Sequence, residues 1–492
     1  MVITNKLKFD SPALTMGGVR VGLSRAIKIL GLTVDDKLTF NEHVANVCRK
    51  ALNLYKQLAR AAKIHWGLNP EVSRTIYNAV VEPVIMYAAS AWAPAAHKKC
   101  VRRQLDAVQR GFVQKIVKAY RTVSLNSALI LAGLLPLDLR IQEAADLYEI
   151  KRGLSQRVIG NREVEKPVSF LDMPHPAHGG ELSFAHLTGE GEPDQPDGQS
   201  LHIYTDGSKI EGKVGAALSV QINNTETESH QLRLDSVCSV YQAELLALER
   251  ATALAAESAA QECSIFCDSR SALETVVNNV SLHPIAFKVR QNMTTSNIPP
   301  KKLKLFWVKA HIGVEGNERA DSLAKDAALR PQGEVDYDRF PVSYAKRQLR
   351  LNTLGEWNRR YQSGTTASIT RMFFPCALEA YRVVRKMRPF GIQTQVLTGH
   401  GGLSEYLHRF KCKESPSCTC DPDVPESVPH ILFECPVFGR EREDLQQKLG
   451  VNVGMRTVAG IMQGRKREEF MSFAGRVMEA VCKRNSSNAI ER

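Results

Sequence analysis

The sequence predicts an α/β protein with a mixed five-stranded sheet and flanking helices, preceded by a mainly helical region and followed by a small zinc-binding, helical region. Three observations predict this. Between residues 200 and 331, extended runs alternate with helical runs. Residues 1–165 carry apolar side chains at helical spacing. Residues 386–445 contain cysteines and a histidine at spacings that suit a metal site.

The N-terminal region, residues 1–165, is predicted to be helical and basic. Thr39-Phe40-Asn41-Glu42 fits a capping box that begins a helix. The apolar side chains that follow recur on one face: Val44, Val47, Ala51, Leu54 and Leu58. Basic residues occupy the other faces, which suits a solvated helix surface as well as a nucleic-acid groove. Residues 166–199 are rich in Pro, Gly and acidic residues, so we predict a flexible linker there.

The central region, residues 200–331, contains the elements of the sheet in order. The predicted strands are 202–208, 214–221, 229–234, 265–268 and 303–308. A helical face beside Glu244 is formed by Val240, Ala243, Ala247, Ala251 and Leu254. Residues 316–329 read as the closing helix. Three consecutive strands, a helix, a strand, helices and a strand together predict a sheet covered on both faces.

Four acidic residues in this region occupy four different local contexts. Asp206 and Asp268 end extended runs, Glu244 lies on a helix, and Asp321 follows a glycine-containing loop that holds His311. Two hard cations about 3.5–4 Å apart activate a water and stabilise the leaving oxygen at phosphorus, and carboxylates are the ligands they prefer. The pattern therefore predicts a two-metal phosphodiester-cleaving site for Mg²⁺ or Mn²⁺. We expect Gly207 to let the chain turn after Asp206, and His311 to move protons near neutral pH.

These motifs resemble the ribonuclease HI family. The matching segments are Thr205-Asp206-Gly207-Ser208, Gln242-Ala243-Glu244-Leu245, Cys267-Asp268-Ser269 and the stretch from His311 to Asp321, which reads His-x-Gly-x-x-Gly-Asn-Glu-x-Ala-Asp. The resemblance implies endonucleolytic cleavage of the RNA strand of RNA–DNA hybrids, leaving 5′-phosphate and 3′-hydroxyl ends. It also implies that Asp206, Glu244, Asp268 and Asp321 bind the metals and that His311 is a mobile loop histidine. Asn317 and Glu318 match too, and we interpret them as supports of the loop and helix start. Residues 281–297 leave no room for the extra basic helix of many free-standing members.

The C-terminal region divides into a basic helical connector (332–385), a Cys/His module (386–445) and a helical tail (446–492). Three thiolates and one imidazole in the module make a candidate tetrahedral zinc shell: Cys418, Cys420, His430 and Cys435. Cys412 and His408 are alternative ligands, and buried cysteines near a satisfied histidine are the alternative without metal. A closed shell leaves no open position for catalysis, so we expect such a zinc ion to fold a nucleic-acid-contacting module.

A second resemblance, to the Pol polyproteins of insect non-LTR (LINE-type) retrotransposons, rests on short segments. These are residues 30–40, 87–94 and 131–137, which look like the thumb and connection that follow the polymerase palm, and residues 399–401, 406–410 and 430–438, which look like the terminal Cys/His motif. Val34-Asp35-Asp36 is not read as the polymerase aspartate pair, because Thr33 stands where an aromatic residue is expected. We interpret it as a turn. The chain is thus expected to be the C-terminal part of a longer Pol polyprotein, with upstream Pol domains as partners.

Composition limits the remaining possibilities. A length of 492 residues suggests two to four domains, and a formal charge of +13 suits a polyanionic partner such as nucleic acid. We expect an intracellular protein, nuclear or cytoplasmic, with reduced cysteines and no membrane association, because we find no signal peptide or apolar span. Two functions stay open: an active ribonuclease H, or an inert nucleic-acid-binding remnant of a reverse transcriptase. An integrase-like enzyme is disfavoured by the position of Glu244 and the His311 motif.

Overall fold

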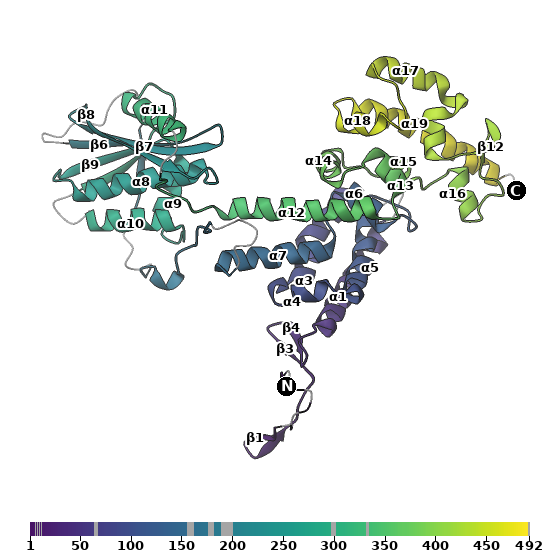
Figure 1. Cartoon of the computed structure of the whole chain (residues 1–492), viewed down its shortest axis with the longest axis horizontal. Helices are drawn as coiled ribbons and strands as arrows, with labels where there is room; N and C mark the ends of the chain where they lie inside the picture. Colours follow the sequence, from purple (N-terminus) through teal and green to yellow (C-terminus); the bar gives the residue numbers. More distant parts are fainter. Residues whose placement is uncertain are drawn as a thin grey trace. The chain divides into compact units, whose positions relative to one another are not determined.

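The computed structural model describes residues 1–4, 6, 8, 10, 12–62, 67–154, 162–175, 182–187, 200–296, 302–330 and 334–490. They divide into two compact units, each with its own hydrophobic core. The first unit comprises Met1–Asp146 and Leu349–Arg492, and the second comprises Leu147–Gln348. Figure 1 labels most of their helices and strands.

The second unit is built on a mixed sheet of six strands in the order β5-β10-β9-β6-β7-β8. Strands β6, β7 and β8 pair antiparallel, whereas β6, β9, β10 and β5 pair parallel. Their bounds are β5 (Phe184–His186), β6 (Ser200–Ile210), β7 (Lys213–Ile222), β8 (Thr225–Leu234), β9 (Glu262–Cys267) and β10 (Lys302–Trp307). The predicted five strands are all present.

The sixth strand, β5, comes from the segment that we predicted to be a linker. It lies at the edge of the sheet and pairs Leu305 with Phe184. Our count of five strands was therefore one too low. A strand of three residues has too little alternation to be recognised by pattern. The Gly-, Pro- and acid-rich stretch 188–199 lies outside the described residues.

Helices cover both faces of this sheet, as predicted (Figure 1). α8 (Val240–Glu257) packs on β6, β7 and β9, with α9 (Arg270–Val277) and α10 (Pro284–Ser296) beside it. α11 (Glu315–Leu329) packs on β6, β7 and β8. The close approach of α11 depends on Gly215, where a Cβ atom would stand 2.4 Å from the Ala324 carbonyl oxygen.

Segments outside residues 200–331 also belong to this unit. The backbones of Val164 and Phe340 form a parallel bridge. The Glu165 carboxylate beside it accepts hydrogen bonds from Gln242 Nε2 (2.9 Å) and the Tyr337 hydroxyl (2.5 Å), and its other oxygen lies 3.1 Å from His283 Nε2. Segments that precede and follow the predicted region 200–331 are thus attached to the second unit by these contacts.

Glu165→Ala is expected to lower the free energy of unfolding by about 1–3 kcal/mol, because it leaves buried donors without their acceptor. Burial raises the pKa of Glu165, but the hydrogen bonds and charge of His283 and the other donors outweigh it and lower this pKa. The stabilisation is therefore present above the ordinary pKa of Glu and is lost as pH falls below it. Thermal unfolding at pH 7 and pH 3 measures this. Glu163→Ala, at a side chain 56% exposed, is the control, and an equal effect of the two changes would contradict the prediction.

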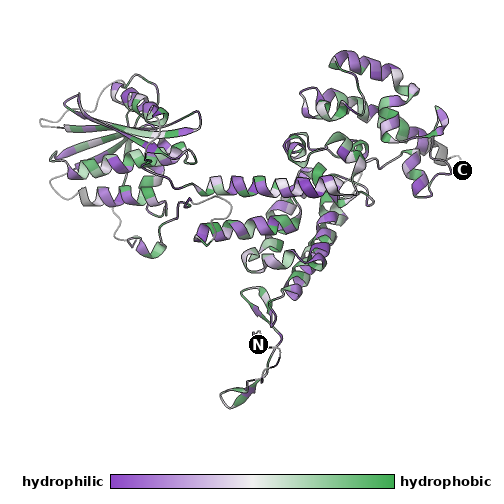
Figure 2. Cartoon of the chain, viewed as in Figure 1, coloured by the Kyte–Doolittle hydropathy of each residue, from purple (hydrophilic) through white to green (hydrophobic). Residues whose placement is uncertain are grey.

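The first unit is mainly helical. Two of its longer helices, α1 and α5, carry hydrophobic residues on one side and hydrophilic residues on the other (Figure 2). The helices are α1 (Asn41–Ala61), α2 (Pro70–Ile76), α3 (Glu82–Met86), α4 (Ala89–Ala96), α5 (Lys99–Ile116), α6 (Leu125–Ala132), α7 (Leu137–Arg152), α12 (Val342–Ser363), α13 (Ser368–Phe373), α14 (Ala377–Met387), α15 (Ile392–Thr398), α16 (Ser404–Arg409), α17 (Gly439–Leu449), α18 (Val458–Gln463) and α19 (Arg467–Ile490), of which α7 and α12 continue into the second unit. The described residues of this unit also form three two-stranded hairpins: β1 (Leu14–Met16) with β2 (Val19–Val21), β3 (Ala26–Ile29) with β4 (Leu32–Asp35), and β11 (Ser417–Cys418) with β12 (Asp421–Pro425).

Residues from both ends of the chain share one core in this unit. Phe112 of α5, Phe373 of α13 and Phe470 of α19 are fully buried within it. We predicted the N-terminal region, the connector, the Cys/His module and the tail as successive segments. The structure packs residues 1–146 and 349–492 together.

The start of α1 differs from our prediction. Its N-cap residue is Phe40, in the left-handed region (φ 56°), with no side-chain cap, so the expected capping box does not form. The Asp35 carboxylate instead accepts hydrogen bonds from the backbone N–H groups of Thr39 (2.9 Å) and Phe40 (2.6 Å). Our interpretation of Val34-Asp35-Asp36 as a turn was wrong for its first two residues, because Val34 and Asp35 end strand β4. The turn follows at residues 36–37, and the Asp35 side chain accepts hydrogen bonds from the chain that leaves it. The apolar stripe is present as predicted, with Leu54 only partly buried.

Among the described residues, no single helix is long and apolar enough to span a membrane. Only the bent pair of helical segments Pro70–Met86 and Ala89–Ala96 meets that criterion of length and composition.

Candidate functional site

Asp206 and Asp268 are brought together by the parallel pairing of β6 and β9. Thr205 stands opposite Cys267 in that register, so the two aspartates are the next residues along their strands. β9 ends there, but β6 continues to Ile210 beside β7. Asp206 therefore lies inside its strand rather than at the end that we predicted, at the point where the neighbouring strand stops.

Glu244 reaches the same place from the first turns of α8. This helix begins with a capping box in which Ser239 and Gln242 exchange side-chain to backbone hydrogen bonds. Gly207 allows the contact, because a Cβ atom there would lie 2.6 Å from the Glu244 backbone nitrogen. Our expectation that Gly207 turns the chain was wrong. It is a strand residue whose missing side chain lets α8 approach β6.

One carboxylate oxygen from each of Asp206, Glu244 and Asp268 lies within 4.8 Å of the others. Asp206 and Glu244 are buried, with 5% and 6% of their surfaces exposed. No donor among the described residues reaches the buried Oδ2 of Asp206. A buried carboxylate oxygen without a protein donor, beside two further carboxylates, can be satisfied by a hard divalent cation, so these residues fit such an ion.

The electrostatics of the cluster agree with that fit. Burial, together with the charges of Asp268 and Asp321, raises the pKa of Asp206 to about 7. Burial and the two neighbouring aspartates raise the pKa of Glu244 well above its usual value. The pKa of Asp268 is raised for the same reason, first by burial. Ionised carboxylates this close repel one another unless a cation lies between them.

Asp321 and His311 stand at the margin of the cluster. Asp321, on α11, forms an ion pair with Lys325 Nζ at 2.6 Å and is not part of the three-carboxylate group. Its charge still raises the pKa values of Asp206 and Asp268. His311 lies exposed in the loop before α11, in the left-handed region (φ 57°), and its charge acts to lower the pKa of Asp268. The structure therefore brings three of the four acidic residues into contact distance and places the other two residues around them.

Two residues beside the site were not assigned to it from the sequence. Asn317, buried in the first turn of α11, makes a hydrogen bond to Asp268 that acts to lower the pKa of that carboxyl. Lys325 neutralises part of the acidic charge through Asp321. The motif around Asn317 was visible in the sequence, but its side-chain direction was not. For Lys325, the only signal in the sequence was its position one helical turn after Asp321.

A second cluster lies in the first unit, in and after the hairpin of β11 and β12. Cys418, Cys420, His430 and Cys435 each place one ligand atom within 4.8 Å of the others. The sulfurs of Cys418 and Cys435 are 3.9 Å apart, which matches the separation of about 3.8 Å for two sulfurs bonded to a tetrahedral zinc ion. His430 Nε2 lies 3.1 Å from Cys420 Sγ. The alternative ligand Cys412 is exposed, and neither it nor His408 belongs to this cluster.

Ionisation of Cys420 and Cys435 in this second cluster is unfavourable when no cation compensates the charge of the thiolates. Burial, followed by contact with Cys418 and Cys435, raises the pKa of Cys420 to about 12. Burial and the charge of Cys418 also raise the pKa of Cys435. All eleven cysteines are free, so no disulfide satisfies these sulfurs. The donor set and its spacing fit zinc.

The comparison with known proteins concerns the second unit. Residues 198–329 match the family model of RNase H. Over 143 residues the chain is 30% identical to a putative 115 kDa protein in the type-1 retrotransposable element R1DM of Drosophila melanogaster, covering 29% of this chain and 14% of that protein. A Pol polyprotein from the retrotransposable element R1 2 of Nasonia vitripennis is 30% identical over 149 residues, which cover 30% of this chain and 36% of the relative.

A free-standing relative is similar over nearly its whole length. The ribonuclease H of Campylobacter jejuni is 27% identical over 150 residues, which cover 28% of this chain and 96% of the relative. The matching residues cover well under half of the length of each of the two retrotransposon proteins. The family match lies within residues 198–329.

Proposed function

We propose that this chain, whose residues 198–329 form an RNase H domain homologous to that region of R1 retrotransposon Pol polyproteins, cleaves the RNA strand of RNA–DNA hybrids. The observation that carries the proposal is the group of three carboxylates, two of them buried and Asp268 half-buried, with an unpartnered oxygen on Asp206. A catalytically inert nucleic-acid-binding remnant is the alternative.

Asp206, Glu244 and Asp268 would hold Mg²⁺ or Mn²⁺, with Asp321 completing the acidic set from α11. Bound divalent ions would supply an activated water and stabilise the leaving oxygen. Asn317 fixes the direction of the Asp268 carboxylate, and Lys325 holds the Asp321 carboxylate through their ion pair. His311, exposed in its loop, is the group suited to carry a proton to or from the site near neutral pH.

A cleavage assay distinguishes the two functions. With Mg²⁺, the full chain is expected to cut the RNA strand of a hybrid and to leave the DNA strand intact. Asp268→Asn should lower the rate by at least about 1,000-fold, because it removes a ligand charge from a buried site. Asp326→Asn, an equal charge change at an exposed position of α11, is the control. If the unmodified chain does not cut the hybrid while still binding it, the inert remnant is the correct function.

The Cys/His cluster is proposed to hold one zinc ion that stabilises the C-terminal part of the first unit. Native mass spectrometry of the full chain is expected to show one zinc ion, absent from Cys420→Ser. Cys412→Ser should keep it, since that cysteine lies outside the cluster. Loss of zinc typically unfolds small structural sites, so Cys420→Ser should also lower the unfolding temperature. A chain without bound zinc, or equal loss in both variants, would contradict this assignment.

The remaining parts are proposed to serve the nuclease within a retrotransposon reverse transcriptase. In this proposal residues 1–165 act as the thumb and connection, the zinc module contacts nucleic acid, and upstream Pol domains supply polymerase activity. The homology of the RNase H region to R1 Pol polyproteins supports it.

A further inference from the structure

A cavity of about 360 Å³ in the first unit is lined by an unusual number of guanidinium groups. We call it the arginine pocket, and its arginines are Arg74, Arg140, Arg350, Arg385 and Arg388. They come from α2, α7, α12 and α14 and from the residue that ends α14. The cavity is separate from the carboxylate cluster and from the Cys/His cluster, since it shares no residue with either.

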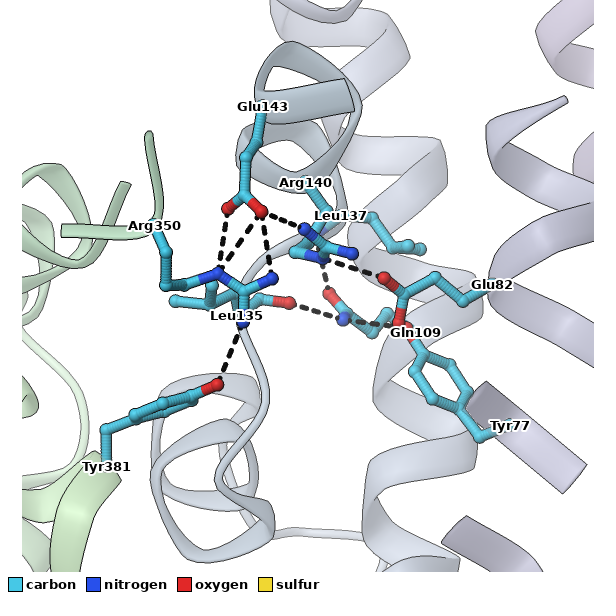
Figure 3. A network of polar contacts seen from close by, with 9 residues as sticks. All are labelled: Tyr77, Glu82, Gln109, Leu135, Leu137, Arg140, Glu143, Arg350 and Tyr381. Carbon is cyan, nitrogen blue, oxygen red and sulfur yellow. Dashed lines mark hydrogen bonds and ion pairs between the residues drawn. The ribbon is translucent and has the colours of Figure 1, made fainter. Parts of the chain in front are cut away.

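Two of these arginines are held rigidly, as Figure 3 shows. Arg140 Nε donates to Glu82 Oε1 at 2.7 Å, and its Nη1 contacts Glu143. Arg350 donates through Nε and Nη2 to Glu143 (2.8–3.2 Å) and through Nη1 to the Tyr381 hydroxyl at 2.9 Å. Their planar donor groups are therefore fixed before any ligand arrives, which lowers the entropy lost on binding.

The adjoining backbone is fixed as well. Gln109 is fully buried, and its Nε2 donates to the Leu135 carbonyl oxygen while its Oε1 accepts from the Leu137 N–H. Leu135 is one of the residues that line the pocket. The segment between α6 and α7 that carries Leu135 is therefore held in place by Gln109, whose contacts Figure 3 shows.

The pocket holds more positive than negative charge. Three carboxylates pair with its five arginines: Glu82 and Glu143 as above, and Glu71, which is 2.8 Å from Arg388 and 3.6 Å from Arg74. Arg385 has no carboxylate within ion-pair distance among the described residues. Its guanidinium group donates to the Tyr381 hydroxyl at 3.3 Å and lies 5.1 Å from the centre of that ring. Burial lowers the pKa of Arg74, and repulsion from the positive charges of Arg388 and Arg385 lowers it further. The negative charge of Glu71 raises this pKa but does not outweigh the other effects. An anion would relieve that repulsion.

We propose that the arginine pocket binds a phosphate group, supplied by the backbone of a nucleic-acid strand or by free phosphate. Guanidinium forks pair with phosphate oxygens through two parallel hydrogen bonds. The volume lies within the range of about 300–1,000 Å³ typical of small-ligand sites, whereas the charged lining is unlike the apolar lining of most of them. The chain's charge of +13 favours a strand, because non-specific nucleic-acid binding depends mainly on phosphate contacts.

The test measures binding of a fluorescent single-stranded DNA to the full chain by anisotropy, over a range of salt concentrations. DNA is not cut by an RNase H, so this readout does not depend on the proposed nuclease. Arg385→Gln is expected to weaken binding about five- to tenfold and to reduce the slope of log affinity against log salt by about 0.7. Arg382→Gln, the same charge change on an exposed residue of α14 that does not line the pocket, should alter neither by more than about twofold.

A second arm measures stabilisation of the folded chain by inorganic phosphate. Arg385→Gln should lose at least half of the rise in unfolding temperature that phosphate produces, and Arg382→Gln should keep it. Loss in both arms assigns the site to strand phosphates, and loss in the phosphate arm alone assigns it to free phosphate. Equal effects of the two variants in both arms would show diffuse charge rather than a pocket and would overturn the proposal, as would no effect of either.

Discussion

Asp206→Asn is expected to raise the stability of the magnesium-free chain at pH 8. Burial and the neighbouring carboxylates raise the pKa of Asp206 from its usual 3.8 to about 7. Folding therefore carries an ionisation penalty that is absent below pH 3.8, grows as pH rises, and is complete above about pH 7. A pKa difference of this size corresponds to at most about 4 kcal/mol, and coupling to Glu244 and Asp268 makes about 1–3 kcal/mol the expected gain.

Denaturant unfolding at pH 5 and pH 8, without and with Mg²⁺, measures this effect. The advantage of Asp206→Asn should be smaller at pH 5 than at pH 8, and it should be largest at pH 8 without Mg²⁺. Adding Mg²⁺ should stabilise the unmodified chain more than the variant, since ligand that binds only the folded state raises its stability. Asp326→Asn should show neither effect. A variant less stable than the unmodified chain at pH 8 would mean that the carboxylates do not repel one another as their geometry requires.

Gly207→Ala is expected to damage both fold and site. The added Cβ atom would meet the Glu244 backbone nitrogen at 2.6 Å and the Ala243 Cβ at 2.9 Å. Neither is the end of a flexible side chain, so α8 must move away from β6. Overpacking of this kind costs about 1–3 kcal/mol or more. A displacement of Glu244 by about 1 Å should lower the rate of hybrid cleavage about 100-fold.

Thermal unfolding and the hybrid cleavage assay together test this. Gly355→Ala is the matched control, because the same atom added within α12 meets nothing within 4 Å. It should leave cleavage unchanged and stabilise the chain by up to about 1 kcal/mol, as Ala does in place of Gly in a helix. Unchanged cleavage in Gly207→Ala would show that the distance between α8 and β6 does not position Glu244.

Most of the site was predictable from the sequence, and the errors in that prediction have a common cause. Asp206, Glu244 and Asp268 were identified from strand and helix patterns, and the structure groups them. The role of Gly207 was misjudged because its neighbours, Ala243 and Glu244, lie on another element. Asn317 was assigned to the loop because its contact with Asp268 crosses from α11 to the end of β9. Each error concerns a contact between residues far apart in the sequence.

The sequence by itself determined the class of the central sheet and identified the members of the carboxylate cluster and of the Cys/His cluster, because periodicity and residue type are local properties. Only the tertiary structure decided that β5 joins the sheet, that Glu165 ties the flanking chain to α8, and that both ends of the chain share a core. It alone also gathered five arginines around one cavity. These features depend on which distant surfaces pack together, and packing is set by complementary shape and burial that no local pattern records.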